Sequence, residues 1–439
     1  MNGLVAKEIR ALLPPWLGCM ALLAAAALMR FRVVEPFSII VIIGGSCTLG
    51  AMSLGHEYTG ATLATMLAQP VGRARVLAVK SAVLVAMLVA LFTLFSAAPP
   101  SGGDPKAGIV AVAIVSGLCL APWLTILTRS PLAGAVLANP VLGVIWVLLN
   151  LLLPTATAAW AFWRIAPVLG VAAVALTWRE FMRLEAIDGR GPHVHMAWNP
   201  ASAAPRVRHA AWAVIRKELG LQQLTFVLAA IYVVGSLRLV SHASGMVRDV
   251  FGGLTVLYGI MLALLIGSLA SAEERQLGTL EWHQLLPMAS WKQWTLKAGT
   301  AIGLALVLGI ALPAVILLTL AADGPIRLTG WHVAGVVLLT AIGLYVSSLT
   351  SSSLRTFFVS AAVPLGLIMA IAAARILPFW PSTPFNFALV LAFVALLLGL
   401  AFDNHRSGER NARRVCTQLF ILWGCFALEL AVGGLVAIR

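Results

Sequence analysis

Charged residues are scarce in this sequence. Of its 439 residues, 10% are Asp, Glu, Lys or Arg, and only 16 are acidic. Soluble domains are about one quarter charged. With 61% hydrophobic residues and a mean hydropathy of +0.97, this scarcity excludes an ordinary soluble protein and predicts an integral membrane protein.

Several motifs of catalysis and cofactor binding are also missing. The dipeptide Gly-Lys does not occur, so the chain has no P-loop to hold nucleotide phosphates. It has no DxD or DDxxD pattern for Mg²⁺, no CxxC pair among its five cysteines, and only scattered histidines. We therefore expect no enzymatic activity, catalytic residue, cofactor or metal. The net charge of +14 is dispersed among apolar runs, which argues against a nucleic-acid partner.

Apolar stretches long enough to cross a bilayer recur along the chain. The distribution of Lys and Arg predicts a multi-pass protein of the cell (cytoplasmic) membrane, with a cytoplasmic N-terminus. The first stretch resembles a signal peptide, but it has a counterpart in the middle of the chain, so we interpret it as a retained helix. We expect thirteen spans, near residues 12–30, 37–55, 77–97, 108–127, 132–153, 158–177, 221–240, 250–270, 296–320, 331–350, 357–377, 384–402 and 417–436.

One polar segment that lies between two apolar stretches occurs twice in the sequence. "EYTGATLATMLAQPVGRARVLAVK" begins at Glu57, and "ERQLGTLEWHQLLPMASWKQWTLK" begins 217 positions later at Glu274. The offset also aligns Thr62 with Thr279, Leu63 with Leu280, Pro70 with Pro287 and Lys80 with Lys297. A second register, with an offset of 210, aligns Lys7-Glu8 with Lys217-Glu218.

These matches predict an all-α polytopic membrane protein with two parallel repeats of six transmembrane helices and one extra C-terminal helix. The expected organisation is a first repeat over 1–190, a cytoplasmic linker over 191–210, a second repeat over 211–403, and a basic segment with the extra helix over 404–439.

The duplicated segment has the signals of a short helix. Its carboxylate, Glu57 or Glu274, ends the second span of each repeat. Thr62 or Thr279 then stands where an N-cap would be, and a proline ends the helix after about two turns. We expect a helix of this kind to lie across the cytoplasmic face in each repeat.

The second copy resembles the segment that follows the second membrane helix in ABC-2 type transporter permeases. There an acidic residue, a Gly-Thr-Leu-Glu run, a Leu-Pro and a basic stretch form the coupling helix that docks on the ATPase. "LVAKEIRALLPPW" and "VIRKELGLQQLTF" likewise resemble the elbow helix before the first span of such permeases. The first copy has Gly-Ala-Thr-Leu in place of Gly-Thr-Leu-Glu and lacks a carboxylate equivalent to Glu281.

The resemblance implies two permease units fused in one chain, together with a separate ATP-binding cassette ATPase subunit, in two copies. Nearly all carboxylates lie outside the predicted spans, so a pathway between the halves would have an apolar lining, which predicts an apolar or amphipathic substrate. Export through the lipid membrane is the direction that the resemblance implies. The residues that it assigns to ATPase coupling are Glu57, Thr62, Leu63, Glu274, Gly278, Thr279, Leu280 and Glu281.

The alternative is an ion-coupled secondary transporter, which can also have parallel repeats of six helices. Such carriers place carboxylates within the membrane as ion sites. The predicted spans put only Glu429 deep within the apolar region, in the unrepeated last span, and this weighs against ion coupling.

Overall fold

The computed structural model describes residues 2–29, 34–60, 62–67, 71–97, 106–184, 210–241, 245–276, 288–320, 329–374, 383–407 and 412–437. The chain divides into two compact units, Met1–Ala204 and Pro205–Arg439. All regular elements in the described ranges are helices. We describe each unit by itself.

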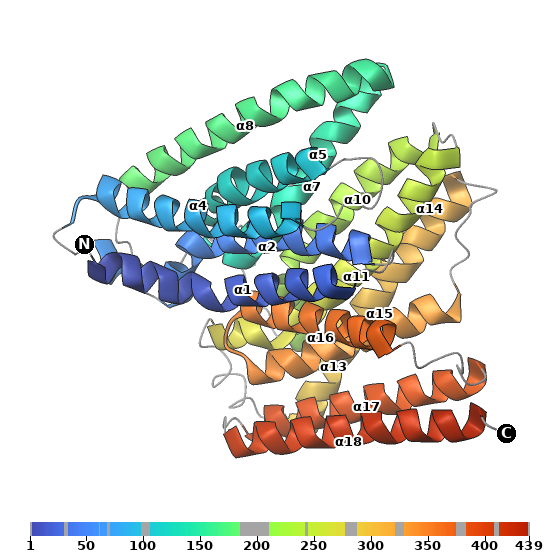
Figure 1. The fold of residues 1–439 in the computed structure, drawn as a ribbon. Coiled ribbons are helices and arrows are strands. Elements are labelled where there is room, and N and C mark those ends of the chain that lie inside the picture. Colours follow the sequence, from blue (N-terminus) through green and yellow to red (C-terminus); the bar gives the residue numbers. More distant parts are fainter. Residues whose placement is uncertain are drawn as a thin grey trace. The chain divides into compact units, whose positions relative to one another are not determined.

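The helices of the first unit follow the apolar stretches of the sequence (Figure 1). Four of its elements are short: a five-residue helix after α2, and three consecutive pieces, the middle one π-helical, that make up the fourth apolar region. The elements are α1 (Asn2–Met29), α2 (Val34–Thr59), α3 (Leu63–Leu67), α4 (Arg73–Ala97), α5 (Lys106–Ala113), η1 (Ile114–Leu120), α6 (Ala121–Thr128), α7 (Pro131–Leu152) and α8 (Thr155–Arg183).

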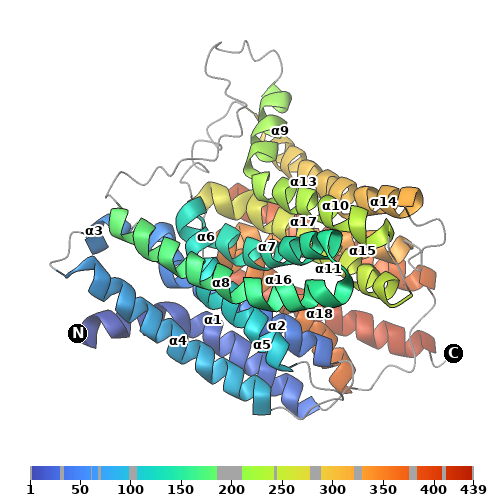
Figure 2. The ribbon, with the colours of Figure 1, turned by 90° about the horizontal axis from the view of Figure 1, so that it is seen from above.

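The second unit also consists of helices and also contains a π-helical stretch. Figure 2 shows its α9 beside α13, and the two helices are in contact. The elements are α9 (Ala210–Leu221), α10 (Gln223–Ser241), α11 (Gly245–Gln276), α13 (Ser290–Leu306), η2 (Val307–Ala311), α14 (Leu312–Leu320), α15 (Gly330–Leu349), α16 (Ser353–Ala374), α17 (Thr383–Ser407) and α18 (Ala412–Ala437).

Ten helices within the described residues are long and apolar enough to cross a membrane, and the bent pair α9–α10 makes an eleventh if it is one span. This is the architecture of an all-helical, multi-pass membrane protein, as the composition predicted. The predicted spans near 357–377 and 417–436 coincide with α16 and α18, which are not among these ten or eleven.

In the first unit, α2 is the central helix. It packs against α1, α4, α5, η1, α6 and α7. Two glycines allow its closest approach: a Cβ on Gly50 would lie 1.7 Å from the carbonyl oxygen of Gly117, and one on Gly117 would lie 2.6 Å from the backbone of Ser46. Small residues at such positions let membrane helices pack backbone to backbone.

In the second unit, α11 and α15 form the tightest helix pair. A Cβ on Gly267 would lie 2.6 Å from the carbonyl oxygen of Thr340 and 2.8 Å from the Cα of Gly343. Gly267 stands 217 positions after Gly50, so the same register that aligns the duplicated segment aligns a close-packed glycine in each unit. In both units the glycine packs against the fourth apolar region, at Gly117 of η1 in the first unit and at Thr340 and Gly343 of α15 in the second.

The two expected elbow helices differ. In the second unit the chain bends by 59° between α9 and α10, at Gln222, whose side-chain amide donates to the Ile266 carbonyl at 3.1 Å. In the first unit α1 is one continuous helix, although Pro14 and Pro15 lie inside it.

The duplicated segment is described in part. In the first copy α3 has only five residues, Leu63–Leu67, rather than the expected two turns. Leu63 and Met66 pack on a hydrophobic cluster that includes Val76 and Phe181. Pro70, the expected linker at 191–209 and the second-copy residues 277–287 lie outside the described residues.

Candidate functional site

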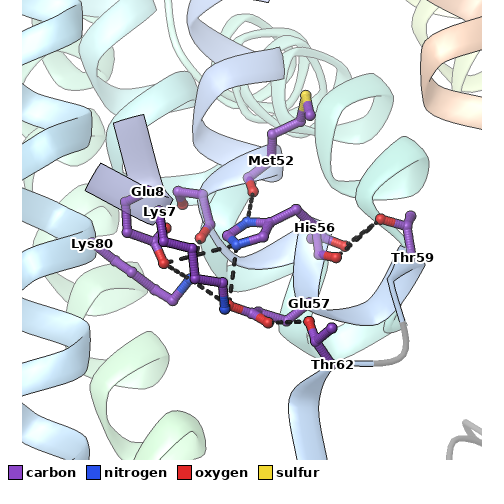
Figure 3. Close-up of polar contacts among 10 residues, drawn as sticks. Lys7, Glu8, Met52, His56, Glu57, Thr59, Thr62 and Lys80 are labelled. Carbon is purple, nitrogen blue, oxygen red and sulfur yellow. Dashed lines mark hydrogen bonds and ion pairs between the residues drawn. The ribbon is translucent and has the colours of Figure 1, made fainter. Parts of the chain in front are cut away.

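The main polar feature of the first unit is a buried ion cluster where α1, α2 and α4 meet (Figure 3). Lys80, from α4, is 1% exposed and lies among three oxygen atoms. Its Nζ donates to Glu8 Oε1 at 2.7 Å, to Glu57 Oε1 at 3.2 Å and to the Ser53 carbonyl at 3.2 Å. One ammonium group therefore connects α4 to both α1 and α2.

Glu57 is the second centre of the cluster. Its Oε1 also accepts a hydrogen bond from Lys7 Nζ at 2.8 Å, and its Oε2 accepts one from the hydroxyl of Thr62. The carboxylate is 1% exposed, whereas Lys7 is 40% exposed, so the cluster reaches the surface through Lys7. Charge-assisted bonds to both oxygens stabilise the ionised form of such a buried carboxylate.

His56 stands beside these carboxylates, one residue before Glu57. Its Nδ1 lies 2.9 Å from the Met52 carbonyl, while its Nε2 lies 3.1 Å from Glu57 Oε1 and 3.8 Å from Glu8 Oε1. Its side chain is 14% exposed. Figure 3 shows the ring between the two carboxylates.

Helix spacing explains how the chain brings these groups together. Ser53 precedes Glu57 by one helical turn, so its carbonyl lies on the same side of α2 as that carboxylate. Lys80 lies two turns after Arg73, where α4 begins, and the rest of α4 follows as a long apolar helix. The ions consequently lie near one end of the bundle, beside the duplicated segment.

The second unit contains a cluster with matching contacts. Lys297 Nζ donates to Glu274 Oε2 and, at 2.8 Å, to the Ala270 carbonyl, and it lies 3.5 Å from Glu218 Oε1. Lys217 Nζ donates to Glu274 Oε1. Lys297 and Glu274 are both fully buried. These contacts connect α9, α11 and α13.

The correspondence extends to sequence separation. In each unit the buried lysine bonds a carboxylate 23 residues before it and a carbonyl 27 residues before it. The helix after α2 that leads into the third span begins at Arg73, and the corresponding helix α13 begins at Ser290, again with the offset of 217. Residues that the two sequence registers align therefore make the same kind of contact in each unit.

One position of the cluster differs between the units. The counterpart of His56 is Glu273, whose Oε2 is buried without a hydrogen-bond partner among the described residues. The first cluster thus pairs two lysines with two glutamates and a histidine. The second pairs two lysines with two glutamates, and Glu273 lies next to Glu274 in the chain.

The predicted coupling residues are found in three situations. Glu57 and Glu274 lie two residues before the ends of α2 and α11 and point into their own units, where the lysines bind them. Thr62 is exposed and directly precedes α3, its hydroxyl donates to Glu57, and Leu63 packs on the core. The others, Gly278, Thr279, Leu280 and Glu281, lie outside the described residues.

The sequence also contained evidence for the lysines and glutamates of the ion clusters that we had not predicted as site residues. Lys7, Glu8 and Lys80, with Lys217, Glu218 and Lys297, were already aligned by the two registers. Opposite charges at matched positions on three apolar helices indicate partners, because an unpaired ion in hydrocarbon is costly. His56 had no such signal, because its counterpart is a glutamate.

The first cluster includes three side chains of the kind that bind metal ions: Glu8, His56 and Glu57 each present a ligand atom within 4.8 Å of the others. The Lys80 ammonium already contacts both carboxylates, so a metal ion would be placed next to a positive charge.

No protein-family model, curated protein or solved structure matches the chain.

Proposed function

We propose that the chain is the membrane-spanning permease of an ATP-binding cassette transporter of the ABC-2 type, with two six-helix repeats fused in one chain. A separate ATPase hydrolyses the nucleotide, and the cargo is a hydrophobic or amphipathic molecule that is exported. The residues of the duplicated segment, from Glu57 and from Glu274, receive the movement of the ATPase on the cytoplasmic face.

The observation that carries this proposal is the pair of matched ion clusters. In each, a lysine at the start of the third span is bonded to a glutamate at the end of the second, and so it closes the loop that contains the duplicated segment. Lys7 and Lys217 add the elbow region of each unit to the same glutamate. A displacement of the duplicated segment is therefore transmitted to three helices at once.

In this mechanism Glu57 and Glu274 are positioning residues. They are buried in their own units, so they do not touch an ATPase, and they hold the segment rigidly against the helices instead. Thr62 fixes the first turn after α2 by donating to Glu57. The exposed part of the segment is left to contact the ATPase. This supports the resemblance in the sequence without depending on nucleotide chemistry in this chain.

A second candidate function is ion-coupled secondary transport. It is favoured by the burial of Glu8, Glu57 and Glu274 within helices long enough to span a membrane, and of Glu218 in the shorter α9. The sequence argument against ion coupling counted only Glu429 deep within a span, and buried acidic residues are the usual ion sites of such carriers. All four carboxylates are, however, close to lysines, which already neutralise them.

Reconstituted vesicles separate the two candidates. The chain is co-expressed with the ATPase encoded nearest to it, purified, and assayed for ATP-dependent transport of lipophilic dyes or lipids. We expect two ATPases per chain and transport that requires ATP in the absence of an ion gradient. Transport that a proton or sodium gradient drives without ATP would refute the permease proposal and support the carrier.

A further inference from the structure

Arg164 is a basic residue within the long apolar helix α8, Thr155–Arg183. Its side chain is exposed, and its guanidinium carbon lies 3.7 Å from the centre of the Trp160 ring, one helical turn earlier. Such a cation–π contact holds the guanidinium over the face of the ring. Because helical side chains point toward the N-terminus of their helix, Arg164 reaches back toward the start of α8.

The length of α8 places this arginine at a membrane boundary. Arg183, which ends α8, follows Arg164 by nineteen residues, or about 29 Å of helix. The hydrocarbon layer of a bilayer is about 30 Å thick. Phe181, near the end of α8, packs in the hydrophobic cluster beside the duplicated segment. Arg164 therefore lies at the opposite surface of the membrane, at the level of the lipid headgroups.

The helices that pack most closely against α8 supply no carboxylate for Arg164. These elements are α4, η1, α6 and α7, and none of them contains Asp or Glu. The acidic residue of α8 itself, Glu180, lies about 24 Å further along the helix. A guanidinium at a membrane surface, without a carboxylate from these helices, is complementary to a phosphate group.

The residues that follow Arg164 on the same face of α8 are apolar and exposed. Val168 and Val171 stand at i+4 and i+7 from it, which is the spacing of one helix face, and they are 69% and 71% exposed. Trp160 is 60% exposed. Another side of α8 is held within the unit, because the buried Phe162 ring packs edge-on against a tryptophan ring of α7. The exposed face thus presents an aromatic ring, a cation and an apolar strip, in that order along the helix.

We propose that this face of α8, formed by Trp160, Arg164, Val168 and Val171, binds one anionic phospholipid. The guanidinium donates to the phosphate oxygens, whose geometry its planar fork matches, and an acyl chain lies along the two valines. A free phosphate ion has no apolar part to cover the valines, so the cation and the apolar strip together favour a lipid. The inference rests on the membrane character of the chain and not on the proposed transport.

Native mass spectrometry of the full chain in detergent tests the site, with phosphatidylglycerol as the anionic lipid and phosphatidylcholine as the zwitterionic one. In about 0.15 M salt the screening length is about 8 Å, so attraction by net charge alone is weak. We expect the wild type to bind its first phosphatidylglycerol more tightly than phosphatidylcholine. Arg164→Gln should weaken the binding of phosphatidylglycerol about tenfold, because it removes a hydrogen bond between charged groups, and should abolish the preference.

Arg179→Gln is the matched control. Arg179 is also exposed on α8, but Glu180 follows it directly in the chain. This variant should bind phosphatidylglycerol as the wild type does. Equal weakening by the two substitutions would show that net charge alone attracts the lipid, and it would overturn the site. Unchanged binding by Arg164→Gln would also overturn it.

Two further measurements keep the test decisive. Trp160→Leu retains the charge and removes the cation–π contact, so it should weaken the binding of phosphatidylglycerol by about two- to fivefold. This variant replaces Arg164→Gln if the latter does not fold, and unchanged binding would contradict the site. Inorganic phosphate is then added at the concentration of the lipid. Displacement of the lipid by phosphate would assign the site to a small anion and overturn the proposal, whereas retention of the lipid supports it.

Discussion

Lys80 and Glu8 are 72 residues apart in the sequence, yet their side chains form a hydrogen bond of 2.7 Å in the interior of the first unit. Neither residue is accessible to solvent to any useful degree. The bond joins α4 to α1 across a region of apolar packing. It also gives the buried Glu8 its hydrogen bond to a cation, so removing either partner leaves an uncompensated charge.

The first prediction concerns this buried lysine and its counterpart. Lys80→Met and Lys297→Met should each lower the free energy of unfolding by about 3–5 kcal/mol, because each removes the lysine that lies against a buried carboxylate, Glu8 or Glu218. Thermal or denaturant unfolding in detergent measures the loss. Lys292→Met, on the exposed face of α13, is the control and should have little effect. Similar losses in all three variants would show that the clusters do not stabilise the fold.

The second prediction separates stability from coupling. Glu57→Ala and Glu274→Ala should destabilise their units to a similar extent, because each carboxylate is bonded by two lysines. Transport per folded molecule should fall further for Glu274→Ala, since the second copy of the segment is closer to the Gly-Thr-Leu-Glu pattern of coupling helices. Equal or reversed transport defects, after correction for folded protein, would contradict the asymmetry.

The third prediction tests helix contact at glycine. Gly50→Ala should destabilise the first unit by about 1–3 kcal/mol or more, because its new methyl group would collide with the backbone at Gly117. Gly44→Ala, on the same helix, is the matched control, since nothing lies within 4 Å of its Cβ position. The difference between their unfolding temperatures is the measurement. Equal stability would mean that α2 and η1 are not packed backbone to backbone.

The fourth prediction concerns the attachment of α18. Gln418 is buried and accepts from Tyr345 at 3.2 Å, while it exchanges two hydrogen bonds with Asn404, at 2.8 and 3.1 Å. Gln418→Leu leaves the Tyr345 hydroxyl and the Asn404 side-chain oxygen without these partners, at a cost of about 1–3 kcal/mol. Limited proteolysis should then release α18 faster.

Thr417→Val is the control for α18, because the Thr417 hydroxyl is exposed and bonds only the backbone of its own helix. Proteolysis of this variant should match that of the wild type. Release of α18 at one rate from wild type, Gln418→Leu and Thr417→Val would argue that apolar packing alone holds this helix in place.

Local patterns in the sequence predicted the helices well but left their ends and bends open. Each apolar stretch of about 20 residues became a helix, because a backbone in hydrocarbon must satisfy its own hydrogen bonds. An elbow helix was expected before the first span of both units, but only the second unit has a bend, at Gln222, and α1 is continuous. Pro14 and Pro15 would have suggested the bend in the first unit, and packing of α1 along α2 and α4 keeps that helix continuous.

The sequence by itself determined that the chain is a helical membrane protein and that lysine and glutamate recur at matched positions, because composition and register are properties of the chain alone. Only the tertiary structure decided that these ions meet in two buried clusters, and that Glu57 and Glu274 face inward. Burial depends on residues brought together from three helices, and no local pattern specifies which side of a helix end is covered. The same reason explains why His56, an isolated histidine in the sequence, lies beside the carboxylates of Glu8 and Glu57.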